Sequence, residues 1–162
     1  MEACETMGGA NNICSDKTGT LTMNQMFLAE FWNTQKVEIK VHQEELTPEY
    51  YFSDKTFLEL FKVASLLNSS AELEPPKGSS TEIAFLKFFK NLGVNYTHER
   101  TNYNIEIKFP FSSARKRMSV ILQFNNQLHL FTKGASEMVL HNCTHIFNST
   151  TGNEEVINPA QV

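Results

Sequence analysis

Apolar residues in the middle of the chain recur at the spacing of amphipathic helices. A first helix is predicted over 57–67, where the apolar side chains share one broad face. They are Phe57, Leu58, Leu60, Phe61, Val63, Ala64 and Leu67. Either Ser53 or Asp54 can cap the first turn, because both side chains accept hydrogen bonds from backbone N–H groups.

A second helix is predicted to open at Ser80 or Thr81. Its apolar positions are Ile83, Leu86 and Phe89, and it continues to Lys90. Gly93 ends it, since glycine readily adopts the left-handed conformation that follows a helix. A third, short helix is expected over 136–140.

Shorter segments with alternating or clustered apolar residues predict strands. The predicted strands are 26–32, 37–41, 105–109, 118–124 and 128–132. Asn33-Thr34-Gln35 suits a hairpin turn between the first two, and Asn125-Asn126 suits a tight turn between the last two. Residues 48–53 and the Pro- and Gly-containing stretch 69–80 are predicted to be exposed loops. A polar tail with a turn at 151–153 follows residue 148.

Composition narrows the class of protein. The 162 residues suffice for one core, or one domain and part of another, and the net charge of −4 without a basic run disfavours nucleic acid as a partner. No apolar run approaches the roughly 20 residues that span a bilayer, and no signal peptide opens the chain. Three irregularly spaced cysteines indicate reduced thiols. His141, Cys143 and His145 would share one face of a strand, but no fourth zinc ligand is evident, so we expect packing or surface roles.

The stretch 12–22 carries the most specific candidate chemistry. Ile13 and Cys14 are predicted to end a short buried strand, which places Asp16 at the carboxyl end where ligands meet α/β sheets. The residues that follow offer an ammonium, two hydroxyls and a glycine: Lys17, Thr18, Gly19 and Thr20. A carboxylate in this setting can attack a phosphoryl group. An ordinary strand-to-turn junction is the alternative, because Asp, Thr and Gly are common turn residues.

Three later segments offer groups that suit a nucleotide. The first, 78–82, ends in Thr81-Glu82, which could equally be an ordinary helix start. The second, 109–120, places Phe111 beside three cations, so that its ring can stack on a purine while Lys116 meets phosphate or ribose oxygens. The alternative is a solvated basic turn. The third, 131–137, ends a strand at Lys133, where Gly134 leaves room around the ammonium.

The uninterrupted heptapeptide 16–22 resembles the phosphorylation motif of the P-type ATPases, the ion- and lipid-transporting pumps. The three later segments resemble, in order, that family's Gly-x-Pro/Ala-Thr-Glu, Phe-Ser/Asn-Ser-x-Arg-Lys-x-Met and Lys-Gly-Ala elements. Two departures are Ser80, where the family usually has Pro or Ala, and Ser113, where some pumps carry an Arg.

The resemblance implies roles for individual residues. Asp16 would be phosphorylated by ATP, assisted by Lys17 and Thr18, and Mg²⁺ would be held by Asp16 and the backbone carbonyl of Thr18. Glu82 would reach the adenine amino group and Phe111 would stack on the base. The remaining residues implied to line the ATP pocket are Lys116, Lys133 and Gly134.

The resemblance also implies a fold and a setting. The expected class is α/β. Residues 1–25 would begin a haloacid-dehalogenase-like phosphorylation domain. Residues 26–162 would form an inserted nucleotide-binding domain of antiparallel sheet and helices, incomplete at its C-terminal end. The parent would be an integral, multi-pass membrane pump with this segment on the cytosolic side, and the fragment alone would neither transport nor turn over ATP.

Several functions within and outside the family remain open from sequence. The sequences of residues 5–8 and 13–15 resemble those of plasma-membrane-type Ca²⁺ pumps more than those of other members. A phospholipid flippase is the alternative within the family. Outside it stand a soluble dehalogenase-type phosphatase and a non-catalytic nucleotide-binding module. Thr18 counts against the phosphatase, because related phosphatases place a second carboxylate two residues after the nucleophile.

Overall fold

The computed structural model describes residues 8–33, 35–40, 47–148 and 150–158. Its helices are α2 (Pro48–Tyr51), α3 (Lys55–Leu67), α4 (Ser80–Asn91), α5 (Tyr96–Thr101) and α6 (Ser136–Leu140), and a single irregular turn, η1, spans Lys17–Leu21. Its strands are β1 (Glu30–Asn33), β2 (Gln35–Glu38), β3 (Glu72–Leu73), β4 (Pro76–Lys77), β5 (Ile105–Ser112), β6 (Arg117–Phe124), β7 (Gln127–Gly134), β8 (His145–Asn148) and β9 (Asn153–Val156).

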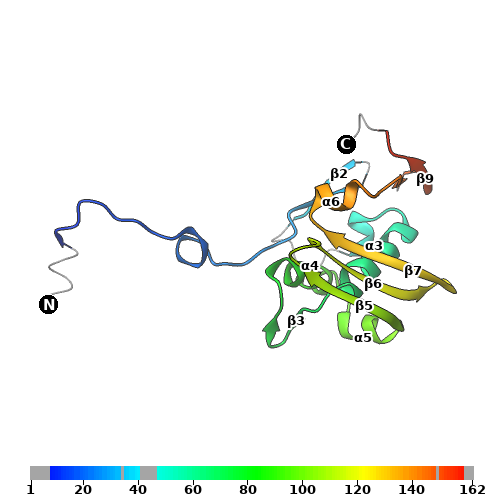
Figure 1. The fold of residues 1–162 in the computed structure, drawn as a ribbon, viewed down its shortest axis with the longest axis horizontal. Coiled ribbons are helices and arrows are strands. Elements are labelled where there is room, and N and C mark those ends of the chain that lie inside the picture. Colours follow the sequence, from blue (N-terminus) through cyan, green and yellow to red (C-terminus); the bar gives the residue numbers. More distant parts are fainter. Residues whose placement is uncertain (1–7, 34, 41–46, 149, 159–162) are drawn as a thin grey trace.

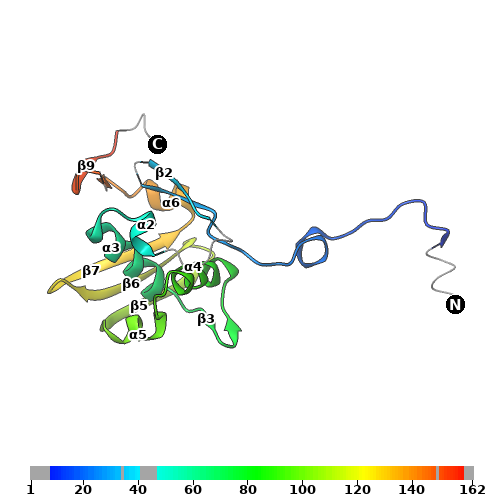
Figure 2. The same ribbon diagram turned by 180° about the vertical axis from the view of Figure 1, so that it is seen from behind.

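A three-stranded antiparallel sheet, in the order β5-β6-β7, forms the centre of the molecule. Helices α3, α4 and α5 lie behind it in Figure 1 and in front of it in Figure 2, so they form one layer against one face of the sheet. Three two-stranded hairpins, β1-β2, β3-β4 and β8-β9, complete the described elements. The fold is therefore a mixed α/β arrangement with a small antiparallel sheet, as the sequence predicts.

The hydrophobic core lies between the sheet and the helices. Alternate residues of β6 point into it, as their near-complete burial shows: Met118, Val120, Leu122 and Phe124. They meet the buried face of α3 and α4, which includes Leu66, Leu86 and Phe89. The other face of the sheet is much more open, and Leu128 and Leu130 on β7 are 69% and 63% exposed. The sheet thus has one packed face and one open face.

Aromatic rings connect the β1-β2 hairpin to the helices. The ring centroid of Phe31 on β1 lies 5.1 Å from that of Phe52 and 5.5 Å from that of Phe61 on α3. Phe52 also contacts Phe88 on α4, with 6.3 Å between centroids. Such pairs add about 0.5–1.5 kcal/mol each beyond the area they bury. They hold the hairpin against the helical layer.

The helix ends follow the capping chemistry that the sequence predicts. Of the two candidate caps of α3, Asp54 is the one used: its Oδ1 accepts a hydrogen bond from the Phe57 backbone N–H at 2.6 Å. At the end of α4, Gly93 adopts a φ of +78°. The Gly93 N–H donates to the Lys90 carbonyl and the Val94 N–H to the Phe89 carbonyl, which is the paired hydrogen-bond pattern of a Schellman motif.

The predicted strands and turns of the main sheet are confirmed. The strands 105–109, 118–124 and 128–132 lie within β5, β6 and β7, and Asn125 and Asn126 have φ values of +50° and +62° in the turn between the last two. The hairpin of β1 and β2 also forms, with Asn33 opposite Gln35. The predicted strands 26–32 and 37–41 coincide with it only in part, because β1 begins at Glu30 and β2 ends at Glu38. Thr34 in its turn and Val41 in the predicted second strand lie outside the described residues.

Four predictions of local structure are wrong or incomplete. Residues 48–51 form α2 and not a loop, because Pro48 at its first position has the φ angle that a helix needs. The stretch 69–80 is an exposed loop only in part: it forms β3-β4 and buries Ser69, Ala71 and Leu73, while residues 74–80 are exposed as predicted. The polar tail has the predicted turn, with Gly152 at a φ of +71°, but this turn closes the β8-β9 hairpin, which was not predicted. Helix α5 was not predicted either.

The predicted buried strand at Ile13 and Cys14 is also absent. Ile13 is 85% exposed, and no described strand pairs with this stretch. A buried parallel strand needs neighbours on both sides. In Figures 1 and 2 residues 8–22 extend away from the sheet and helices, so nothing there supplies such neighbours. Among the described helices, none is long and apolar enough to cross a membrane.

The cap of α3 yields a test of the fold. Asp54→Ala should lower the free energy of unfolding by about 1 kcal/mol, because the Phe57 N–H loses its acceptor. Chemical denaturation of both proteins measures the difference. Ser53→Ala is the matched control and should change stability by less than about 0.5 kcal/mol. A larger effect of Ser53→Ala than of Asp54→Ala would show that the wrong residue has been identified as the cap.

Candidate functional site

Four of the sequence-predicted site residues converge at one end of the main sheet. The end of β5, the start of β6 and the end of β7 meet there, with Ser112 opposite Arg117 and Arg117 opposite Gly134. Phe111 is one residue before Ser112, and Lys116 occupies the β5-β6 turn. Lys133 lies opposite Met118. Phe111, Lys116, Lys133 and Gly134 therefore share one end of the sheet.

Helix α4 brings the fifth residue, Glu82, to the same place. Glu82 lies in the first turn of α4, and its Oε1 is 2.5 Å from Nζ of Lys133. Its Oε2 accepts a hydrogen bond from the backbone N–H of Ser70 at 3.3 Å. The Glu82 side chain is 12% exposed and that of Lys133 is 33% exposed. A largely buried carboxylate is thus held between a strand cation and a loop amide.

The loop that supplies this amide is itself fixed to the sheet. Nδ2 of Asn68 donates hydrogen bonds to the carbonyls of Met118 and Phe131, at 3.3 and 3.2 Å. Nζ of Lys108 donates to the Ser69 carbonyl at 2.9 Å. Burial, assisted by the nearby charge of Arg100, holds the pKa of Lys108 below its usual value. These contacts fix the position of Ser70 relative to Glu82.

Sequence reasoning missed Asn68, Ser70 and Lys108. Lys108 takes a polar position in the alternating strand 105–109, a pattern that predicts a solvent-facing side chain, so the sequence contains no signal for its hydrogen bond to the Ser69 carbonyl. Ser70 acts through its backbone N–H, which every residue except proline possesses, so no side-chain motif marks it.

The turn between β5 and β6 presents an aromatic ring and a cation. Phe111 is 62% exposed, so its ring is available to a ligand. Lys116 has a φ of +50°, which is unusual for a residue with a side chain, and its N–H donates to the Ser112 carbonyl at 2.7 Å. This hydrogen bond closes the turn and keeps Phe111 and Lys116 near each other.

Gly134 allows the close approach of β7 to this turn. Its neighbour Ala135 donates a backbone hydrogen bond to the Lys116 carbonyl at 3.0 Å. A Cβ atom on Gly134 would overlap that carbonyl oxygen and would lie 2.8 Å from Cβ of Arg117. The structure therefore requires glycine at this position because a side chain would clash with the turn. This is a different reason from the expected room around the Lys133 ammonium, which stays a prediction.

The basic run does not act as one group. Arg115 and Arg117 line a cavity of about 500 Å³ together with Ser119 and Thr132, whose hydroxyls are hydrogen bonded at 2.9 Å. Ser119 alternates with the core residues Met118 and Val120, so this cavity is on the open face of the sheet. Arg117 and Lys133 thus face opposite sides of the sheet, while the three cations expected beside Phe111, namely Arg115, Lys116 and Arg117, lie in and directly after the β5-β6 turn.

The loop around Asp16 is far from this site in the structure. Turn η1 is closed by the Thr22 N–H, which donates to the Lys17 carbonyl at 3.1 Å, and by the Gly19 N–H, which donates to Oγ1 of Thr22 at 3.3 Å. Asp16 is exposed, and the turn stands apart from the sheet in Figures 1 and 2. The structure therefore does not bring Asp16 together with Glu82.

The donors of this loop fit Mg²⁺ only in part. The Asp16 carboxylate and the Thr18 carbonyl are hard oxygen ligands, the kind Mg²⁺ prefers, and it usually takes one or two carboxylates plus water and substrate phosphate. Among the described residues no three His, Cys, Asp or Glu side chains form a group that could hold a metal. His141 and Cys143 lie in the turn after α6 and do not share a strand face with His145.

Comparisons with known proteins identify the family. Residues 56–161 match the P-type ATPase cytoplasmic domain N. The chain belongs to the P-type ATPase family.

Relatives extend the similarity beyond this domain. "Calcium-transporting ATPase PAT1" of Dictyostelium discoideum is 38% identical over 88% of the chain, and "Calcium-transporting ATPase 12, plasma membrane-type" of Arabidopsis thaliana is 36% identical over 93%. "Plasma membrane calcium-transporting ATPase 1" of Gallus gallus is 35% identical over 98%. The chain spans only 13–15% of the length of these relatives.

The match to the P-type ATPase domain N covers all five residues at the sheet end. It begins after the Asp16 loop, which only the longer matches to whole pumps include. The expected nucleotide-binding residues therefore lie inside the P-type ATPase domain that the comparison identifies.

Substitution of Gly134 tests the packing of the site. Gly134→Ala should lower the free energy of unfolding by about 1–3 kcal/mol, because the new methyl group cannot fit against the Lys116 carbonyl without moving β7. Chemical denaturation gives the change. Gly8→Ala is the control, since a Cβ on Gly8 meets nothing within 4 Å. A neutral effect at Gly134 would mean that β7 does not approach the turn as described.

Proposed function

We propose that the end of the main sheet is an ATP site, and that Glu82, Phe111, Lys116, Lys133 and Gly134 form it. The observation that carries the proposal is the Glu82–Lys133 pair, which α4 and β7 place beside the exposed Phe111 turn within domain N.

Each group has a role that its surroundings permit. The Phe111 ring is exposed enough to stack on adenine, which is worth about 1–3 kcal/mol for bases on aromatic rings. A carboxylate has about four lone-pair positions, so Glu82 can accept from the adenine amino group while it keeps Lys133 and the Ser70 N–H. The Lys116 ammonium is assigned to phosphate or ribose oxygens, whereas Lys133, held against Glu82, is assigned to the wall of the pocket near the base.

We further propose that the chain forms part of an ATP-driven calcium pump that is integral to a membrane, with these residues on the cytosolic side. The names of the relatives support calcium over phospholipid as the transported substrate. Residues 1–25 would begin a haloacid-dehalogenase-like phosphorylation domain, and residues from 26 onward the inserted nucleotide domain. Thr18, in the position of a phosphatase's second carboxylate, disfavours the soluble phosphatase. Taken by itself, without the rest of the pump, the chain would act as a non-catalytic nucleotide-binding module.

Phosphoryl transfer would use Asp16. One carboxylate oxygen attacks the γ-phosphorus of ATP, the bond to the bridging oxygen breaks, and ADP leaves with that electron pair. Lys17, the Thr18 hydroxyl and the backbone N–H groups around Gly19 would offset the negative charge of the phosphoryl group. Mg²⁺, held by Asp16 and the Thr18 carbonyl, would supply neutralisation of phosphate charge. Asp16 must move towards the sheet end for this, because the described arrangement separates them.

Binding of ATP by the chain tests the nucleotide site. ATP titrated into the protein should shift amide NMR signals around Glu82, Phe111, Lys116 and Lys133, with a dissociation constant on the order of 0.1–1 mM. Phe111→Ala should weaken binding about tenfold through lost stacking. Lys116→Ala should weaken ATP more than adenosine, since its ammonium is assigned to phosphate or ribose oxygens.

Trp32→Ala is the matched control, because Trp32 is an exposed aromatic residue on β1 that lies outside the site. It should leave the affinity for ATP unchanged. Equal loss in both variants, or ATP-induced shifts confined to other surfaces, would contradict the assignment of the pocket.

Phosphorylation tests the role of Asp16 separately. In the full-length pump, incubation with labelled ATP and Mg²⁺ followed by an acid quench should give an acid-stable, hydroxylamine-sensitive label. Asp16→Asn should abolish the label, because an amide cannot form the acyl phosphate. Ser15→Ala, at the adjacent residue, should keep it. Full labelling of Asp16→Asn would exclude Asp16 as the acceptor and would leave the nucleotide site itself unaffected.

A further inference from the structure

One peptide group connects Lys108 to the candidate ATP site. The Lys108 ammonium donates a hydrogen bond to the Ser69 carbonyl at 2.9 Å, and the Ser70 N–H donates one to Oε2 of Glu82 at 3.3 Å. The Ser69 carbonyl and the Ser70 N–H belong to the same planar unit, and in a trans peptide they point in opposite directions. The ammonium and the carboxylate therefore hold the two opposite ends of a single peptide group.

Strand register explains why Lys108 can reach this peptide group. Lys108 lies opposite Val120 in the pair of β5 and β6, and Val120 is fully buried in the core. Directly opposite residues of antiparallel strands project from the same face of the sheet. The Lys108 side chain thus leaves β5 on the side of the helical layer. Because β5 is an edge strand of the described sheet, the ammonium reaches the loop from the border of the core.

The Lys108 ammonium affects this peptide group in two ways that both favour the contact with Glu82. A cation at the carbonyl oxygen polarises the peptide group, which strengthens the hydrogen bond that its N–H donates. The cation also opposes rotation of the planar unit, which would turn the N–H away from the carboxylate. Burial lowers the pKa of Lys108 and the charge of Arg100 adds to this, whereas the nearby Glu82 carboxylate opposes it, as expected for charges on either side of one peptide group.

We propose that Lys108 is a positioning residue, which orients the Glu82 carboxylate through the peptide group of Ser69 and Ser70 and thereby sets the preference of the site for adenine. The adenine preference rests on the proposed ATP site, in which Glu82 accepts a hydrogen bond from the adenine amino group. Oε1 of Glu82 is held by Lys133 and Oε2 by the Ser70 N–H. Without Lys108 the peptide group loses the donor at its oxygen end, and the carboxylate keeps only Lys133 as a fixed partner.

Base preference tests this role. The probes are ATP and ITP, whose base carries a carbonyl group in place of the adenine amino group, titrated into the protein and followed by NMR. The parent protein should bind ATP about tenfold more tightly than ITP, because only adenine can donate to Glu82. Lys108→Met removes the ammonium and should weaken ATP about fivefold while it changes ITP by less than about twofold. Lys108→Arg keeps a cationic donor and should restore the preference.

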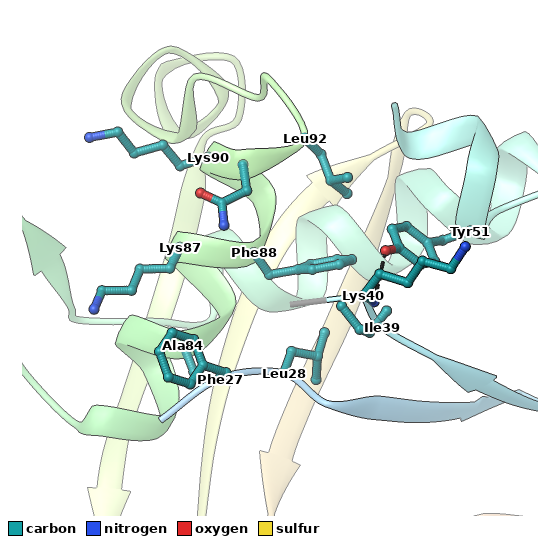
Figure 3. Close-up of a pocket in the computed structure, with 11 residues that line it drawn as sticks. Phe27, Leu28, Ile39, Lys40, Tyr51, Ala84, Lys87, Phe88, Lys90 and Leu92 are labelled. Carbon is teal, nitrogen blue, oxygen red and sulfur yellow. Dashed lines mark hydrogen bonds between the residues drawn. The ribbon is translucent and has the colours of Figure 1, made fainter. Parts of the chain in front are cut away.

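Lys87→Met is the matched control, because Lys87 is a lysine on the same helix as Glu82 that lines a separate cavity of about 300 Å³. Figure 3 shows it there beside Phe27, and its ammonium lies 5.9 Å from the centre of that ring. None of the five proposed ATP-site residues lines this cavity. The control variant should therefore keep the preference of the parent protein for ATP.

A double variant separates this role from general damage to the fold. If Lys108 acts through Glu82, then Lys108→Met should change the affinity for ATP by less than about twofold in a Glu82→Ala background. The same loss of affinity in both backgrounds would overturn the proposal. A Lys108→Met variant that keeps the full preference for ATP would also overturn it, as would an equal loss of ATP and ITP, since a purely structural role weakens both.

The Ser70 amide signal tests the positioning of Glu82 without any nucleotide. In the free protein its proton resonance should move upfield in Lys108→Met and in Glu82→Ala, because the hydrogen bond is weakened in one and lost in the other, and should stay in place in Lys87→Met. An unchanged signal in Lys108→Met would overturn the proposal. If the parent protein binds neither ATP nor ITP, the proposed ATP site fails, and the Ser70 signal still supports or overturns the role of Lys108.

Discussion

The Asn68 side chain links the helical layer to the sheet at the point on which the candidate ATP site depends. It follows α3, and its two amide hydrogens reach carbonyls on β6 and β7. Its Oδ1 is buried, with no hydrogen-bond partner among the described residues, which is a cost that the two donated bonds must offset. This bridge fixes where α3 ends and therefore where the next residues begin.

The position of Glu82 follows from that bridge. Ser69, next to Asn68, is held by Lys108 of β5, and Ser70 then donates its N–H to Glu82. Lys133 completes the set from β7. The carboxylate is thus positioned by backbone and side-chain donors from the loop and the sheet, while its own helix α4 contributes only the attachment point. Because these donors come from the 68–70 loop and from two strands, the fold itself sets the position of the Glu82 carboxylate.

Much of this fold could be predicted because its signals are local. The apolar spacing in α3 and α4, the Asp54 cap, the Asn125-Asn126 turn and Gly93 each act within a few residues. The failures concern contacts between distant segments. Ser69, Ala71 and Leu73 are buried by α4 and the sheet, which lie elsewhere in the sequence. The two prolines and the glycine of the stretch, taken alone, predict that it is exposed. The prediction at Ile13 is wrong in the opposite sense: burial was expected and the residue is exposed. An apolar residue forms a buried strand only where other strands pair with it.

The same distinction applies to the site. Short motifs located Glu82, Phe111, Lys116, Lys133 and Gly134, and the structure gathers all five at one sheet end. Motifs did not reveal that Arg115 and Arg117 line a cavity on the open face, because the strand period of two decides this only once the register is known. Nor did they reveal the Asn68 and Ser70 contacts, whose partners are up to 63 residues away in sequence.

Helix α4 joins the two parts of the chain that phosphoryl transfer must unite. Its first turn carries Glu82, and its neighbour Thr81 contacts the sulfur of Met26 at 3.8 Å. One turn further on, the Lys87 ammonium lies over the Phe27 ring. Met26 and Phe27 belong to the segment that leads from Asp16 to β1. A helix is a rigid element, so a shift of this segment along α4 alters the path of the Asp16 loop while Glu82 stays attached to Lys133. In the proposed phosphoryl transfer, the segment 22–28 lies between the Asp16 loop and the elements that carry the candidate ATP site, so the approach of Asp16 to that site would require this segment to rearrange.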